Sequence, residues 1–357
     1  MKRIEALDIL RFAAAVLVVG YHYGQDADLG YFKDIFNAFV PPVLTFFFAL
    51  SGFVLTIAYF DRKGVSARDF YLARFARLAP LYWLALVGIA VLRYGVRQQW
   101  VSLFLSATFL QSWFHPFALD YNDVGWAISV EVFFYLTFPL ILSLIRASKV
   151  TSRVFFWIAL AAYLLTQVIL IAALNSPHYP GFPSPEYNLL HFSPWPHYCT
   201  FLLGISAGWF YLEHRERVLT GPASYAILLS AFALTFVVVQ FLPGWLRHSG
   251  FRLPINASFY APLFLGLILA VAFAQNRVTE ALGWRPLVML GAVSYAYFIF
   301  QRPFVEAFKF TYELFHLNPT SAFFAVALSL LAFAFLAYYF VEQPAKSLFT
   351  KIFKHSA

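Results

Sequence analysis

Three ionisable residues, Asp8, Arg11 and His22, interrupt an apolar run near the start of the chain, LDILRFAAAVLVVGYHYG over residues 7–24. A charged side chain at the centre of a bilayer costs about 2.5–3.5 kcal/mol on insertion scales, so such residues usually mark a functional site. Asp8 and Arg11 are spaced to pair on a helix, and eleven residues bring His22 back to the face of Arg11, about 16 Å further along. The spacing predicts a polar stripe that faces the interior of a helix bundle, with all three residues as catalytic candidates.

A second candidate is Glu131, in the segment WAISVEVFFYLTFP over residues 126–139. We expect Trp126 at the outer membrane interface, where aromatic residues anchor helices, and Glu131 about one turn below it, at the depth of His22. A carboxylate and an imidazole at one depth can act as a base and its orienting partner. The alternative is a buried glutamate that pairs with a nearby cation and serves packing alone.

Two further motifs have both a structural and a functional interpretation. Arg74 and Arg77, in RFARLAP, can hold phosphates through their planar guanidinium groups, or can simply keep their loop on the cytoplasmic side. Ser51 and Gly52, in FFFALSGF, can permit close helix packing, or can form part of a tunnel wall beside residues 7–24.

The composition is that of a polytopic membrane protein, because 61% of the 357 residues are hydrophobic, only 12% are charged and the mean hydropathy is +0.70. The sequence predicts an all-α bundle of about ten transmembrane helices. Residues 101–114 are too few to span and are expected to form a short re-entrant or interfacial helix. The expected spans are residues 7–24, 40–60, 79–96, 126–145, 154–174, 198–212, 223–242, 258–275, 286–303 and 320–341.

The basic residues predict the orientation of this bundle. A net charge of +8 could indicate nucleic acid, but in a membrane protein the distribution of Lys and Arg matters more. With the N-terminus inside, 17 of the 25 basic residues fall in cytoplasmic segments and seven fall outside, the remaining one being Arg11. Counting 101–114 as a span would place the cluster at 146–153 outside. We therefore expect both termini in the cytoplasm and no nucleic-acid partner.

One transmembrane domain is expected over residues 1–345, followed by a short basic cytoplasmic tail over 346–357 that lies on anionic lipid. Glu342 and Pro344 are expected to end the last helix. The proline-rich loop 175–197 contains His178, His191 and His197, but their spacing fits no metal-binding motif, so no metal site and no permanently bound cofactor are expected.

Five of these segments, in this order, resemble the motifs of the acyltransferase family 3 membrane proteins, which O-acylate sugars of surface polysaccharides, peptidoglycan and secondary metabolites. LDILRFAAAVLVVGYH is similar to the opening Arg and His motif of that family, here Arg11 and His22. The other four are FFFALSGF, RFARLAPLYW, WAISVEVFFYLTFP and VEQPAKSL. The chain departs from the family pattern at Gln301, where a His is frequent, and at Ala127, where a Ser is common.

The resemblance implies an integral membrane acyltransferase of the bacterial inner membrane. Its donor would be a cytosolic acyl-CoA, often acetyl-CoA, and its acceptor a hydroxyl of a carbohydrate or glycan. Arg11 would lie along the path, and His22 would be the base or the acyl carrier, positioned by Glu131. The donor would meet Arg74, Arg77, Ser51 and Gly52, whereas Trp126, Ser129 and Gln301 would lie on the acceptor side. A transporter or flippase of a glycolipid or small polar metabolite is the main alternative, and a membrane sensor or scaffold is a third.

Overall fold

The computed structural model describes residues 4–62, 64, 66–93, 100–314 and 316–354. All the secondary-structure elements within these residues are helices or single helical turns, so the fold is all-α. The termini of the expected domain and tail, residues 1–3 and 355–357, lie outside the described residues, as do 94–96 of the third expected span. Within the described part of the chain, seven helical segments are long and apolar enough to cross a membrane. They are α1 (Ala6–Tyr23), α2 (Phe32–Tyr59), α3 (Ala67–Leu92), α5 (Gly125–Ser148), α6 (Ser152–Leu174), α9 (Gly221–Ser249) and the run from α13 (Pro319–Ala337) into α14 (Gln343–Lys354). The predicted fold class, a polytopic helix bundle, is confirmed.

The other three expected spans also contain helices: α8 (Trp195–His214), α10 (Ala261–Phe273) and α12 (Arg285–Leu314). With 13 residues, α10 is about 20 Å long, which is less than the roughly 30 Å of a bilayer core. The stretch 101–114 holds α4 (Trp100–Ala107) and the 3-10 turn η1 (Gln111–Trp113), neither of which can span a membrane. The remaining short elements are η2 (His115–Phe117), α7 (Pro185–Phe192) and α11 (Arg277–Leu282).

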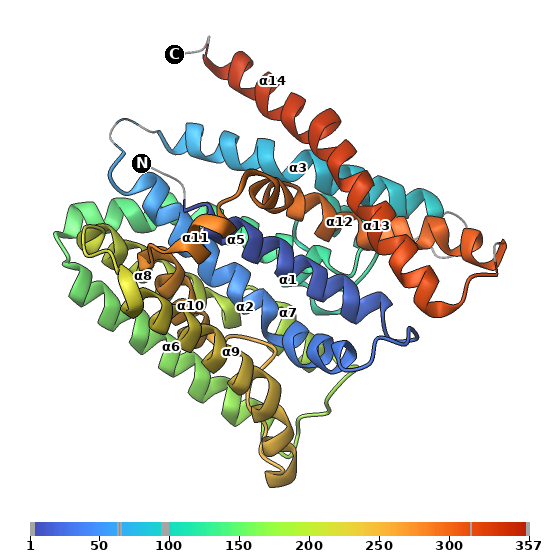
Figure 1. Cartoon of the computed structure of the whole chain (residues 1–357), viewed down its shortest axis with the longest axis horizontal. Coiled ribbons are helices and arrows are strands. Elements are labelled where there is room, and N and C mark those ends of the chain that lie inside the picture. The colour runs from blue at the N-terminus through green and yellow to red at the C-terminus, as the bar shows by residue number, and fades with distance from the viewer. Residues whose placement is uncertain (1–3, 63, 65, 94–99, 315, 355–357) are drawn as a thin grey trace.

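Helix α1 lies in the middle of the bundle between α2 and α12 (Figure 1). A side chain at Gly20 would meet the ring of Phe36 at 2.6 Å, so the end of α1 lies beside the start of α2 and the two helices are antiparallel. A side chain at Gly291 would meet the carbonyl oxygen of Asp8 at 2.4 Å, so α12 approaches α1 closely at the opposite end. These contacts show that Asp8 lies at the level of Gly291 on α12, and that the end of α1 that carries His22 lies at the level of Phe36 on α2.

The two ends of the bundle differ in charge. At the end that carries Asp8, here called the basic end, the Arg146 guanidinium donates to the carbonyl of Phe60 at 2.8 Å and caps α2. Arg215 pairs with Asp61 at 3.4 Å at the same end. Segments far apart in the sequence, all placed inside by the distribution of Lys and Arg, thus meet at the basic end. The opposite end, at the level of His22, is here called the His22 end.

The prediction that Glu342 and Pro344 end the last helix is wrong. The chain passes from α13 through a turn of π-helix, η3 (Tyr338–Glu342), directly into α14. Proline is tolerated in the first turn of a helix, where its missing N–H has no intrahelical partner, and here it follows the π-turn. Most of the expected cytoplasmic tail is therefore helical and packs on α3, with the rings of Phe349 and Phe75 5.9 Å apart.

Helices α2 and α8 cross at a pair of glycines. A side chain at Gly52 would lie 2.3 Å from the carbonyl oxygen of Phe201, and one at Gly204 would lie 2.3 Å from that of Ala49. Gly52 therefore permits close helix packing, which is one of the two interpretations that the sequence left open.

We expect Gly52→Ala to lower the melting temperature and the amount of folded protein in the membrane, because the added methyl group forces α2 and α8 apart. Gly266→Ala on α10 is the matched control, since a side chain there meets nothing within 4 Å. Thermal unfolding in detergent measures both variants. Equal melting temperatures for the two would show that the crossing is not tightly packed.

Candidate active site

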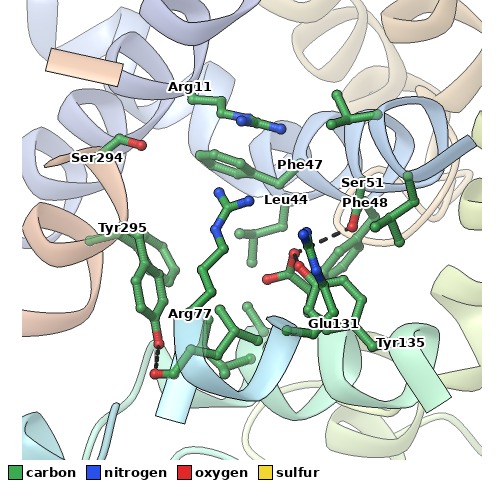
Figure 2. Close-up of a pocket in the computed structure, with 17 residues that line it drawn as sticks. Arg11, Leu44, Phe47, Phe48, Ser51, Arg77, Glu131, Tyr135, Ser294 and Tyr295 are labelled. Carbon is green, nitrogen blue, oxygen red and sulfur yellow. Dashed lines mark hydrogen bonds between the residues drawn. The ribbon is translucent and has the colours of Figure 1, made fainter. Parts of the chain in front are cut away.

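A narrow pocket lies between α1, α2, α3, α5 and α12, and it brings together five of the residues proposed from the sequence. Arg11, Ser51, Arg74, Arg77 and Glu131 all line it. Figure 2 shows the guanidinium groups of Arg11 and Arg77 directed into the same space, with Ser51 and Glu131 on its far side. The other lining residues include Tyr135, Ser294, Tyr295 and a set of apolar side chains.

Glu131 is held by two hydroxyl groups. Ser51 Oγ donates to Glu131 Oε1 at 3.3 Å, and the hydroxyl of Tyr135, one turn further along α5, donates to the same oxygen. Glu131 is half-buried, and the carboxylate acts electrostatically on Arg77, together with Glu342 and Asp8. A carboxylate that is partly withdrawn from water needs such partners, because removing an unpaired charge from water is costly.

Arg74 is fixed among aromatic rings from three helices. Its guanidinium lies 5.6 Å from the ring centre of Tyr59, 5.9 Å from that of Phe70 and 5.9 Å from that of Tyr135. It also donates to the hydroxyl of Tyr59 at 3.2 Å. Cation–π contacts of this kind stabilise an arginine away from water while its charge is retained. The segment that carries Arg74 and Arg77 begins at a capped helix end, where Ser66 accepts from the amide of Asp69 at 3.0 Å.

The narrow pocket opens into a wider cavity at the basic end, here called the vestibule. The two share Arg11, Arg74, Arg77, Val54 and Leu55 in their walls. The vestibule measures about 820 Å³ and the narrow pocket about 90 Å³. Further lining residues of the vestibule are Tyr59, Arg62, Asp69, Tyr338, Glu342 and Lys346. Three arginines therefore form the neck between a wide, charged entrance and a small inner pocket.

Ser51 and Gly52 have different surroundings, although they are adjacent. Ser51 faces the narrow pocket and bonds Glu131, whereas Gly52 faces α8 and is not among the residues that line the pocket. The expectation that Gly52 contacts the donor is therefore corrected. On a helix, neighbouring residues point about 100° apart, so one of this pair serves the site and the other serves packing.

The expected pairing of His22 with Glu131 is wrong. His22 is exposed at the far end of α1, and the charged residues that act on it are Asp123 and Arg302. Asp123 pairs with Arg302 at 3.3 Å. It lies eight residues before Glu131 in the sequence, a separation that corresponds to roughly 12 Å of helix. Glu131 lies instead in the pocket of Arg11. The carboxylate at the level of His22 is Asp123.

Trp126 does not lie at an exposed interface as expected. It is only 7% exposed, and its ring packs 5.0 Å from that of Phe192 and 6.1 Å from that of Phe48. Ser112 donates to the carbonyl of Trp126 at 2.9 Å, so the segment before α5 folds back over this residue. The start of α5 is thus covered by protein, so the Trp126 side chain packs in the protein interior.

The other two residues expected on the acceptor side are also buried. Ser129 donates to the carbonyl of Phe109 at 2.5 Å and therefore holds the segment that covers α5. Gln301 is fully buried and donates to the carbonyl of Phe298 at 2.8 Å, next to Arg302. Ser129 therefore serves the packing of the segment over α5. Gln301 is adjacent in sequence to Arg302, which forms ion pairs at the His22 end.

Sequence reasoning missed these ion pairs. Arg302 pairs with Glu306 at 2.9 Å as well as with Asp123, and it acts electrostatically on Tyr23. Glu306 in turn accepts from Arg93 at 3.0 Å. The spacing of Arg302 and Glu306, four residues apart on a helix, was the available signal. Tyr135 and Tyr295 were missed as well, because a tyrosine in an aromatic-rich span carries no distinguishing pattern.

Comparison with known proteins identifies the family of this chain. The sequence profile of the acyltransferase domain matches residues 4–339. The chain is 29% identical over 320 residues to the acyltransferase MdmB of Streptomyces mycarofaciens, covering 83% of this chain and 78% of that protein. It is 24% identical to a Bacillus subtilis protein named "Putative peptidoglycan O-acetyltransferase YrhL", covering 96% of this chain and 55% of the relative. A Staphylococcus aureus (strain COL) protein named "Putative O-acetyltransferase" is 22% identical, with 96% and 57% covered.

The chain thus spans just over half the length of two of these curated relatives. No solved structure matches it. A polytopic bundle with buried charges on α1 and a profile match over nearly the whole chain defines a multi-pass membrane acyltransferase. The chain belongs to the acyltransferase family 3 and is an O-acyltransferase.

We expect Tyr135→Phe to lower acyl transfer about 10-fold or more, because a hydrogen bond to a charged group contributes about 1.5–3 kcal/mol and this one positions Glu131. The measurement is the O-acetyl content of cells that carry only the variant, at matched protein level. Tyr71→Phe is the control, since the Tyr71 hydroxyl also bonds α5, at the carbonyl of Leu136, but on the exposed surface. Equal activity of the two variants would mean that the Tyr135 hydroxyl does not serve the site.

Proposed function

We propose that this O-acyltransferase takes an acyl group, first of all acetyl, from cytosolic acyl-CoA and transfers it to a hydroxyl of a carbohydrate or glycan. This proposal rests on the vestibule, which is lined by basic side chains and opens into the narrow pocket that contains Glu131. The transporter and sensor alternatives are set aside, because the family is one of acyltransferases. The location proposed is the bacterial inner membrane, with the basic end toward the cytosol.

The donor end suits a molecule with several phosphates. Arg62, Arg74, Arg77 and Lys346 line the vestibule from three separate segments of the chain. Guanidinium groups bind phosphate through paired, charge-assisted hydrogen bonds. Asp69 and Glu342 line the same cavity, and Lys346 pairs with Glu342, so the acidic residues keep the vestibule from being uniformly positive. The nucleotide of CoA would occupy the vestibule, with its thioester arm reaching the neck.

The acceptor end is proposed around His22, which is exposed and lies near Asp123 and Arg302. Transfer breaks the C–S bond of the thioester and forms a C–O bond to the acceptor. The hydroxyl proton passes to His22 and is finally taken up by the CoA thiolate, if His22 acts as the base. His22 can instead accept the acyl group and pass it on. A carbohydrate acceptor is supported by the name of the Bacillus relative, which refers to peptidoglycan.

Arg11 and His22 are eleven positions apart on α1, which corresponds to about 16 Å of helix. The acyl group therefore has to move from the neck toward the His22 end while it is still bonded to the CoA sulfur, so that the C–S bond breaks only where His22 or the acceptor hydroxyl attacks. Arg11 marks the start of this path and Gln301 adjoins its end. Asp123 replaces Glu131 as the carboxylate proposed to act on His22.

The test of this function is mass spectrometry of surface glycans and extractable lipids from a deletion strain. We expect an O-acyl modification to disappear in the deletion strain and to return with the wild-type gene, but not with His22→Ala at equal protein level. Restoration by His22→Ala would remove His22 from the mechanism. An unchanged set of O-acylated glycans in the deletion strain would contradict the proposed acceptor class.

A second test concerns the donor. Arg74→Lys combined with Arg77→Lys keeps both charges but removes the planar fork, so we expect a raised Michaelis constant for acetyl-CoA at normal protein level. Arg153→Lys, an exposed residue in the first turn of α6, is the control. Normal donor kinetics of the double variant in nanodiscs would mean that these arginines serve topology alone.

A further inference from the structure

The narrow pocket has two chemically different ends. Its neck is formed by Arg11, Arg74 and Arg77, next to Glu131. Its far end is apolar and is lined by Leu44, Phe47, Phe48, Ala127, Ile128 and Phe298. Leu44 and Phe47 precede Ser51 on α2, and Phe298 lies between Tyr295 and Arg302 on α12, so the apolar end points from the neck toward the His22 end.

The apolar end is small and its walls are well supported. The whole narrow pocket holds about 90 Å³, which is less than the roughly 150 Å³ of an engineered apolar protein cavity that binds benzene. The ring of Phe47 lies 6.2 Å from that of Phe298, and that of Phe48 lies 5.3 Å from that of Phe134. Phe48 also packs 4.9 Å from His197. Rings fixed from two sides cannot move aside without disturbing a packed core.

We infer that the apolar end of the narrow pocket binds the acyl group of the donor and restricts it to short chains of about two to four carbons. This inference rests on the proposed function, because it takes acyl-CoA as the donor. With the thioester at the neck, an acyl chain can extend only forward, between Phe47, Phe298 and Leu44. A chain of eight carbons would have to displace these rings, whereas an acetyl group fits without doing so.

The same residues lie on the path that the acyl group takes toward His22. On α2, Ser51 is fifteen residues from Phe36, which contacts the His22 end of α1, and this corresponds to about 22 Å of helix. The apolar end covers the first part of that distance. It therefore selects the acyl group before the acceptor is reached, and the acceptor site itself need not recognise chain length.

The experiment compares acetyl-, butyryl- and octanoyl-CoA as donors for purified protein in nanodiscs, supplied with the glycan fraction of the deletion strain. For the wild type we expect kcat/KM for octanoyl-CoA to be about 100-fold or more below that for acetyl-CoA, in line with the discrimination that apolar pockets reach. Phe47→Ala and Phe298→Ala should raise the octanoyl-to-acetyl ratio at least 10-fold. Leu136→Ala, on the exposed face of α5, is the control and should leave the ratio unchanged.

Leu44→Phe is the opposite variant, because it fills the apolar end and should lower the rate with butyryl-CoA more than that with acetyl-CoA. It keeps the test decisive if an alanine variant fails to fold. The inference would be overturned if the wild type used octanoyl-CoA as well as acetyl-CoA, or if active variants kept the wild-type octanoyl-to-acetyl ratio. Either result would leave the proposed function intact. If no acyl-CoA of any length is consumed while the cells still O-acylate their glycans, the proposed donor is wrong.

Discussion

The structure depends on the burial of arginine charges inside a membrane-spanning bundle. Arg11, Arg74 and Arg77 reach one pocket from α1 and α3, where each charge would be costly without compensation. Asp8 pairs with Arg11 at 3.5 Å, aromatic rings surround Arg74, and Glu131 acts on Arg77. These partners come from α1, α2, α3 and α5, so the bundle must close around the arginines to pair them. The same closure creates the neck between the vestibule and the narrow pocket.

The fold class and half of the candidate site could be predicted from the sequence, for identifiable reasons. Hydropathy locates the apolar helices, and charged residues within them must face the protein interior, so the inward-facing pair of Asp8 and Arg11 follows from their being polar in an apolar span. Short apolar length likewise predicted that residues 101–114 do not span. The small residues Ser51 and Gly52 suggested close helix packing, and Gly52 does lie where α2 packs closely against α8.

The depth of Glu131 could not be predicted, because it was judged from Trp126 as an interfacial anchor. That judgement assumes that nothing covers the start of α5, yet Gln111, Ser112 and Phe109 fold back and bond Tyr82, Trp126 and Ser129. Such long-range contacts leave no periodic signal in the chain. The continuation of α13 into α14 was missed for a similar reason, since Pro344 ends a regular helix but is accommodated after a π-turn.

The two ends of α1 thus belong to two sites, with the donor proposed at the basic end and the acceptor at the His22 end. The most direct measurement uses native membrane vesicles of both orientations and acetyl-CoA carrying a radiolabelled acetyl group, added outside the vesicles. The separation of sites predicts that inside-out vesicles transfer label to a glycan in their lumen, where it stays protected until the vesicles are opened. Labelling of glycans in sealed right-side-out vesicles by external acetyl-CoA would contradict it, because donor and acceptor would then be used from the same side.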